Sequence, residues 1–301
     1  MKRTSRSAAA TSSPTGGGRK CATMEVHSAL LERVEGYAAR LHALEHSTQL
    51  RLMAVQPPWK PVTIPVVVNV VYRTAGENLP DAQIQSQIDS LNADYTATNP
   101  DKATTPAPFA GRIGDPGVRF KLVKIVRKKT TQSSFGASGD PVKKSASGGV
   151  PPTDSKSKLN LWACTLGDGL LGYAQFPLGP VETDGVVILN KAFGTVGALS
   201  PAFNLGRTAT HEIGHWLNLR HIWGDSPDCG ADDGVADTPI QGIANTGVPT
   251  FPHISCHNGP HGDLFMNYMD YTDDRGMVMF THGQVERMHA ALLGPRKAYR
   301  V

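Results

Sequence analysis

The sequence of 301 residues lacks a long hydrophobic run. Its longest apolar stretch, residues 64–71, is interrupted by Pro65 and Asn69, whereas a transmembrane helix needs about 18 consecutive apolar residues. We therefore expect no membrane insertion. The first twenty residues also lack the apolar core of a secretory signal peptide, because their longest apolar run is residues 8–10. No export signal is visible in the sequence.

A strong excess of one charge is also missing. The sequence has 30 Lys and Arg against 26 Asp and Glu, and residues 1–20 alone hold five of the basic residues and no acid. The other 281 residues therefore have 25 basic and 26 acidic side chains. A nucleic-acid-binding protein carries its basic excess on the folded surface, so we expect no nucleic-acid partner. Residues 1–20 are dominated by Ser, Thr, Ala and Gly, which predicts a disordered tail.

Cysteine is scarce, and its count does not fix the redox compartment. The four residues, which allow three pairings, are Cys21, Cys164, Cys229 and Cys256. What the chain does have is 40% hydrophobic residues, enough for the core of one large domain or two small ones.

Hydrophobic periodicity predicts an α/β (α+β) fold. Apolar residues at steps of three and four predict a helix from about His27 to Met53, and the Pro-rich residues 56–61 read as a linker. A second helix begins near Asp81, and a third begins at a capping box of Thr281 and Gln284. Strands are predicted at 64–72, 118–126, 159–164, 170–176 and 185–190, with a long surface loop at 128–158.

The chemistry is concentrated in one further predicted helix and the turn after it. On this helix His211 and His215 would lie one turn apart, so that both imidazoles can face one metal ion. Glu212 lies beside them without being a ligand. His221 follows six residues after the second histidine and reaches the same metal only if the chain turns sharply. Asn218, which tolerates the left-handed backbone conformation, suits that turn.

This spacing matches the metzincin signature H-E-x-x-H-x-x-G-x-x-H, followed by a Met-turn, at every position except Asn218. Downstream, Met269 would form the hydrophobic floor of the site, and Tyr271 follows two residues later. The alternative interpretation is three unrelated histidines and a Met and Tyr of the ordinary core. A third histidine at this offset makes a chance match rare.

At these motifs the sequence resembles the pappalysin family of metzincins, secreted zinc endopeptidases related to pregnancy-associated plasma protein A. The resemblance implies a metzincin zincin-like fold: a twisted, mainly parallel sheet with an active-site helix and a Met-turn, preceded by a helical pro-segment. Besides the zinc helix, the matching stretches are CATME (21–25), DAQI (81–84), LNLW (159–162), LGYAQFP (171–177), DGVADTP (233–239), NYMDY (267–271) and FTxxQ (280–284).

The resemblance also implies a role for each residue of the zinc site. His211, His215 and His221 would hold Zn²⁺ and leave a fourth position open for water. Glu212 would take a proton from that water and pass it to the leaving amine. Tyr271 would help to stabilise the tetrahedral intermediate, with a packing role as the alternative. The implied reaction is hydrolysis of peptide bonds in a protein or peptide substrate.

The resemblance further implies that Cys21 occupies the fourth zinc position and keeps the enzyme latent until cleavage. An ordinary thiol or a bridge to Cys164 is the alternative. Extracellular localisation is inferred from the family. The chain would then consist of a tail (1–20), a pro-segment (21–60) and a catalytic domain (61–301), with subdomains of about 61–217 and 218–301.

An acidic loop follows the zinc helix, and members of the resembled family bind calcium there. Its composition alone would indicate an ordinary solvated turn. Cys229 and Cys256 bracket the loop, and we expect a disulfide between them that fastens a segment with little core. The residues that would supply calcium ligands are Asp232, Asp233, Asp237 and Thr238.

Two smaller features concern the substrate and the third ligand. Residues 172–176 could form a cleft rim that pairs with an extended peptide. Members of the family often favour a basic residue at the scissile bond, and Asp273 or Asp274 could line such a pocket unless Arg275 neutralises it. Asp225 could accept a hydrogen bond from a ligand imidazole or serve as a turn residue.

Two other functions are compatible with a zinc helix. One is a non-metzincin zinc hydrolase with a distant Glu ligand, against which His221 and Met269 argue. The other is a zinc-binding protein with a structural or vestigial site. Glu212 argues against it, because a structural site has no need of that carboxylate.

Overall fold

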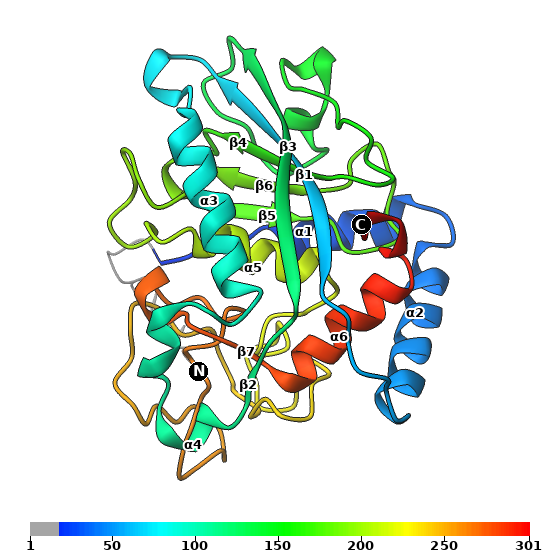
Figure 1. Cartoon of the computed structure of the whole chain (residues 1–301), viewed down its shortest axis with the longest axis vertical. Coiled ribbons are helices and arrows are strands. Elements are labelled where there is room, and N and C mark those ends of the chain that lie inside the picture. Colours follow the sequence, from blue (N-terminus) through cyan, green and yellow to red (C-terminus); the bar gives the residue numbers. More distant parts are fainter. Residues whose placement is uncertain (1–17) are drawn as a thin grey trace, which may run out of the picture.

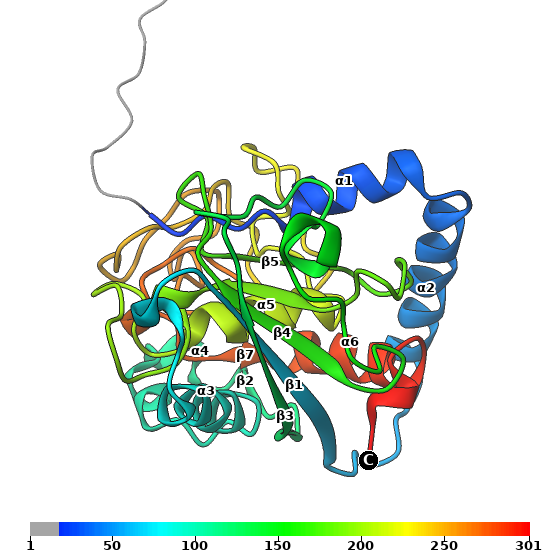
Figure 2. The same cartoon turned by 90° about the horizontal axis from the view of Figure 1, so that it is seen from above.

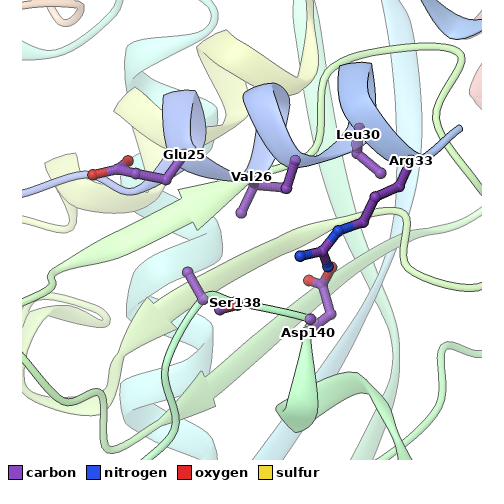
Figure 3. Close-up of a pocket in the computed structure, with 9 residues that line it drawn as sticks. Glu25, Val26, Leu30, Arg33, Ser138 and Asp140 are labelled. Carbon is purple, nitrogen blue, oxygen red and sulfur yellow. The ribbon is translucent and has the colours of Figure 1, made fainter.

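In a computed structural model, described for residues 18–301, helices cover one face of a five-stranded sheet (Figure 1). The other face is covered by loops and by the first helix, α1 (Thr23–Arg33) (Figure 2), and Val26 of this helix and Ser138 of a loop line the same pocket (Figure 3). All neighbouring strands are parallel except β5 and β6. The predicted mainly parallel sheet is therefore confirmed. The strands, in spatial order, are β3 (Val118–Lys129), β1 (Val62–Tyr72), β4 (Leu159–Cys164), β6 (Val186–Leu189) and β5 (Gly172–Ala174), and β2 (Ile113–Gly114) pairs separately with β7 (Phe280–Thr281).

The main core lies between the sheet and the helices on one of its faces. Ile84, Ile88 and Leu91 recur at helical spacing on α3 and are buried there. The last helix, α6, starts at the predicted capping box of Thr281 and Gln284. The helices are α1 (Thr23–Arg33), α2 (Tyr37–Leu52), α3 (Asp81–Asp94), α4 (Ala107–Ala110), α5 (Arg207–Trp216) and α6 (His282–Leu293).

The N-terminal segment, residues 18–55, corrects two predictions. The single helix predicted over 27–53 is wrong, because α1 and α2 are separated by Gly36, whose φ of 68° is left-handed and cannot continue a helix. The predicted tail of residues 1–20 is too long, because Arg19 is only 4% exposed. Residues 1–17 of that predicted tail lie outside the described residues.

Residues 128–158 do not form the predicted surface loop. Strand β3 continues to Lys129, and the chain after it covers the second face of the sheet. Phe135, Val142 and Val150 are buried there, and the backbone oxygen of Val150 accepts a 2.9 Å hydrogen bond from the indole of Trp162. Isolated apolar residues among Ser, Gly and Lys have no period, so the sequence pattern does not reveal this packing.

Helix α5 lies against β5 and β6, at the opposite edge of the sheet from β3. Helix α1 contacts β5 from the other side, and α2 packs against α6 (Figure 2). None of the helices in residues 18–301 has the length and apolar character that a membrane crossing requires. The N-terminal segment and the predicted zinc helix, α5, therefore contact the same strand, β5.

Candidate metal centre

Helix α5 and the turn after it bring the three predicted histidine ligands together. The Nε2 atoms of His211 and His215 are 3.2 Å apart. The helix ends before Asn218, whose φ of 74° is the left-handed conformation expected of this residue. The turn carries His221 back, and its Nε2 lies 3.1 Å from that of His215.

Each imidazole is oriented by an oxygen at its other ring nitrogen, Nδ1. For His211, His215 and His221 these are the backbone oxygens of Tyr268 and Leu219, at 2.7 Å each, and the carboxylate of Asp225. Because these oxygens accept, each Nδ1 donates, and the three Nε2 lone pairs face one another. Asp225 also has a φ of 61°, so it is both an acceptor and a turn residue. Burial lowers the pKa of His211 and His215, which keeps them neutral.

Cys21 joins this cluster from the N-terminal segment. Its Sγ and one ring nitrogen of each of the three histidines lie within 4.8 Å of one another. Its thiol donates to Oε2 of Glu212 at 3.3 Å, and the hydroxyl of Thr23 donates to the same oxygen at 3.0 Å. Burial raises the pKa of the Glu212 carboxyl to about 7. Burial, together with the charge of Glu212, also raises the pKa of the Cys21 thiol.

Met269 and Tyr271 lie next to the histidine cluster, where the sequence pattern predicts them. The ring of Tyr271 is 4.9 Å from that of His221, and its hydroxyl donates to the backbone oxygen of Cys21 at 3.4 Å. Met269 is fully buried beneath α5. A Cβ built on Gly214 would lie 2.4 Å from the sulfur of Met269. Gly214 is therefore a site residue that the sequence pattern does not reveal, because its need for a position without a side chain depends on this tertiary contact.

The N-terminal segment runs along β5. Cys21 and Gly172 form a parallel bridge. Three hydrogen bonds hold the segment: Leu171 N to Lys20 O at 2.9 Å, Ala22 N to Gly172 O at 3.1 Å, and Ala174 N to the hydroxyl of Thr23 at 2.8 Å. The segment therefore uses the backbone positions at which an extended substrate is expected to pair.

A buried ion pair lies next to the cluster. Arg19 donates to Asp274 at 2.7 Å, and the two side chains are 1% and 0% exposed. Its other N–H groups donate to the hydroxyl of Thr208 at 3.0 Å and the backbone oxygen of Thr272 at 3.3 Å. Arg275, the neighbour that could have neutralised Asp274, is exposed, and the cation that pairs with Asp274 is Arg19. Arg19 lies within the predicted tail of residues 1–20, because a single Arg two residues before a Cys gives no signal in the sequence.

The acidic residues of the predicted calcium loop accept hydrogen bonds from several different groups of the chain. Asp237 accepts two hydrogen bonds at the start of α6, and Asp232 accepts one from a backbone amide. Asp233 accepts a 2.9 Å hydrogen bond from the hydroxyl of Thr238. The second carboxylate oxygen of Asp233 is buried and has no hydrogen-bond partner among residues 18–301. Burial raises the pKa of this carboxyl to about 8.

The cysteines fall into one pair and two free thiols. Cys229 and Cys256 form the expected disulfide, with their Cα atoms 5.8 Å apart. Cys164 is a free, fully buried thiol on β4, and Cys21 is the free thiol of the cluster. The alternative of a bridge between the last two is therefore excluded.

The peptidase M43 family model, described as pregnancy-associated plasma protein-A, matches residues 159–293. An extracellular metalloprotease of Arthroderma benhamiae is 34% identical, and the match covers 75% of this chain and 76% of that protein. Among solved structures, Tannerella forsythia mature mirolysin in complex with a cleaved peptide is 46% identical, with coverage of 81% and 97% and a TM-score of 0.79. A Tannerella forsythia promirolysin mutant is 42% identical, with coverage of 94% and 97% and a TM-score of 0.85.

Proposed function

Because the chain belongs to the pappalysin family of metzincin metalloendopeptidases, we propose that it is the zymogen of a zinc endopeptidase that is blocked by its own N-terminal segment. The pro-segment includes the buried Arg19 in addition to the predicted residues 21–60, and residues 61–301 are the catalytic domain, whose subdomains meet at Asn218. The observation that carries this proposal is the cluster of Cys21 with three histidine nitrogens. The larger share of this chain covered by promirolysin than by mature mirolysin, 94% against 81%, supports it.

The donor set of the cluster fits zinc. Tetrahedral Zn²⁺ with nitrogen ligands at about 2.0–2.1 Å holds those nitrogens about 3.3 Å apart, and the Nε2 separations of 3.1 and 3.2 Å are close to that value. His211, His215 and His221 would hold the ion, and Cys21 would add a soft sulfur ligand. When bound, zinc polarises the scissile carbonyl and lowers the pKa of the attacking water.

The chain supplies the other catalytic groups. Glu212, whose carboxylate borders the cluster, takes a proton from the attacking water and delivers it to the leaving amine. The hydroxyl of Tyr271 now donates to the backbone oxygen of Cys21, and in the open enzyme it donates to the oxygen of the scissile carbonyl. Met269 packs under the histidines and positions them.

The pocket filled by Arg19 indicates the preferred substrate. Asp274 is a fully buried carboxylate, and a substrate without a cation at this place would leave it unpaired. We expect an Arg or Lys next to the scissile bond, with Arg preferred because its fork also reaches Thr208 and Thr272. Proteins outside the cell are the substrate class, since the relatives are named extracellular metalloproteases.

Calcium binding in the acidic loop is a further part of the proposal. The buried, unpartnered oxygen of Asp233 suits a hard cation. Asp237 already holds the start of α6 with both carboxylate oxygens, so we expect it to orient the loop. Asp232 and Thr238 flank Asp233 and are the other candidate ligands.

The test is digestion of an unfolded protein by the purified chain, before and after limited proteolysis in the linker of residues 56–61. We expect activity to appear on trimming and to be lost with Glu212→Ala or a zinc chelator. Cys21→Ala should be active without trimming, whereas Cys164→Ala, the matched buried thiol, should stay latent. If the trimmed chain is folded and binds zinc but cuts no substrate, the site is structural and the proposal is wrong.

A further inference from the structure

Strand β3 is a basic stripe on an otherwise acidic chain. Six of its twelve residues are Lys or Arg, and none is acidic. Outside this strand and residues 1–20, the sequence has 19 Lys and Arg against 26 Asp and Glu, a net charge of −7. The peptidase site uses none of these basic residues.

Four of these cations lie on one face of the sheet. Arg119, Lys121, Lys124 and Lys128 pair in register with Thr63, Pro65, Val67 and Val71 of β1. Register partners in neighbouring strands point to the same side, and the β1 partners have odd numbers only, so the four cations share a face. The register shift at Val123 maintains this alignment, because without it Lys124 and Lys128 would point into the core. We call these four residues the basic ladder.

The basic ladder is long, and its four residues are exposed. Strand β3 is an edge strand of the sheet (Figures 1 and 2). The β1 partners of the ladder run from Thr63 to Val71, which is eight steps of roughly 3.3 Å, or about 26 Å. Neighbouring cations are spaced by about 7 Å, except for a gap of about 13 Å before the last.

The ladder cations are not used in ion pairs within the described chain. Among residues 18–301, no carboxylate lies within 4.0 Å of their charged groups. In contrast, Arg127 on the other face of β3 is held by Asn78 and by Asp81 at the start of α3. The acidic neighbour of the ladder is Asp154, whose pKa is lowered first by its own hydrogen-bonded partner Lys158 and then by Lys124.

From this geometry we infer that β3 binds a linear sulfated polysaccharide along the basic ladder. A row of unpaired cations complements a chain of regularly spaced anionic groups. A single-stranded nucleic acid would need aromatic side chains for base stacking, and the aromatic residue of β3, Phe120, is 3% exposed. A membrane surface would need apolar residues to insert, and the large apolar side chain that β3 exposes is Val123 alone, at 45%.

Protection of the sheet edge is the competing explanation, because lysines on edge strands prevent pairing with other chains. Here the edge is already blocked in part by Asn92, whose side chain pairs with both backbone groups of Phe120, at 2.7 and 3.2 Å. The shared face itself follows from the fold, because Val118, Phe120 and Leu122 pack against the main core from the other face of β3. Neither core packing nor edge protection requires four cations without ion-pair partners among residues 18–301 in one row, whereas a linear polysaccharide with regularly spaced anionic groups can contact all four.

The basic ladder lies at the opposite edge of the sheet from β5, which rims the catalytic cleft. A polysaccharide bound there leaves the cleft and the N-terminal segment uncovered. The ladder would therefore hold the peptidase on a sulfated matrix without inhibiting it. This inference goes beyond the proposed peptidase and stands without it, so Glu212→Ala is expected to bind the polysaccharide like the wild type.

The experiment is calorimetric titration of the full chain with heparin oligosaccharides of defined length at near-physiological salt. The test variant is Lys121→Gln/Lys124→Gln/Lys128→Gln. Its matched control removes three exposed lysines that lie elsewhere, Lys144→Gln/Lys191→Gln/Lys297→Gln. We expect the dissociation constant to rise about tenfold in the test variant, at a factor of about two for each exposed charge contact. The control should stay within about twofold of the wild type.

Several results would overturn the inference. One is the absence of heparin binding by the wild type. Another is an equal loss in both variants, which would indicate only net charge, and a third is an unchanged affinity in the test variant, which would place binding in the basic residues 1–20. Self-association of the test variant with unchanged heparin affinity would support edge protection. Tighter binding of single-stranded DNA or anionic lipid vesicles would assign the ladder to another partner.

Discussion

Replacing Arg19 with Ala should weaken the latency of the chain strongly. The guanidinium is buried, and its removal leaves the carboxylate of Asp274 buried without its cation. Breaking a buried pair in this way costs about 3–5 kcal/mol. We expect the lower value, because Asp274 keeps hydrogen bonds from the backbone amides of Leu205 and Arg207, at 2.8 and 3.3 Å. About 3 kcal/mol corresponds to a roughly 100-fold smaller ratio of docked to undocked N-terminal segment.

The assay is cleavage of a short fluorogenic peptide by the untrimmed chain, immediately after purification and zinc loading. Arg19→Ala should show about 100 times the basal activity of the wild type. Arg19→Lys should fall between them, because a Lys keeps the charge but presents its donors from one nitrogen and so cannot reproduce the fork of Nε, Nη1 and Nη2 that reaches Thr272, Thr208 and Asp274. The control is Lys20→Ala, since Lys20 is exposed and, within residues 18–301, its side chain donates a single hydrogen bond, to the backbone oxygen of Asp168.

The reasoning would be refuted by an Arg19→Ala chain that is folded, loaded with zinc and as latent as the wild type. Latency would then depend on Cys21 and on the helices of the N-terminal segment. Equal activation by Lys20→Ala would also contradict it, because that result would indicate general loosening of the segment.

Three further predictions concern the packing under the metal centre, the turn and the N-terminal helices. Gly214→Ala should lower stability by about 1–3 kcal/mol through overlap with the sulfur of Met269, and the same substitution should lower the thermal midpoint by less in a Met269→Ala background, where that sulfur is absent. Asn218→Gly should leave activity of the trimmed enzyme nearly unchanged, and a large gain would mean that the left-handed Asn strains the third ligand. Hydrogen bonds from Arg287 lower the pKa of Glu45 to about 2, so this contact stabilises the chain above about pH 4.5 and loses that effect as the pH falls toward 2. Glu45→Gln should therefore unfold at a lower urea concentration than the wild type at pH 6, and a difference that persists undiminished at pH 3 would contradict this.

The zinc ligands could be predicted from the sequence because their spacing is local. His211 and His215 are one turn apart on a helix, and the third ligand needs a single left-handed residue, which Asn218 supplies. Such relations hold whatever the rest of the chain does. The same is true of the capping box that starts α6 at Thr281.

What could not be predicted depends on contacts between distant parts of the chain. Arg19 meets Asp274 across 255 residues, and Gly214 is required only because Met269 lies beneath it. The break at Gly36 was missed for a different reason. A glycine within an amphipathic pattern is compatible with a continuous helix at a cost of only about 1 kcal/mol, so packing decides whether the helix continues.

Residues 19–23 contact every part of the proposed active site at once. Arg19 fills the acidic pocket, Cys21 joins the histidines and contacts Glu212, and the backbone of residues 20–22 pairs with β5. A small shift of the segment therefore cannot free one of these groups alone, because the same short stretch holds them all.

Removal of the whole segment is the route to an open site that this arrangement permits. Residues 53–61 form no helix or strand and are mostly exposed, so they are accessible to a protease. A cut there turns docking of the segment from an intramolecular into a bimolecular equilibrium, and the effective concentration supplied by the tether, of the order of millimolar, is lost. The contacts that keep the intact chain latent are then opposed by dilution, and a single cleavage in the linker suffices to start release.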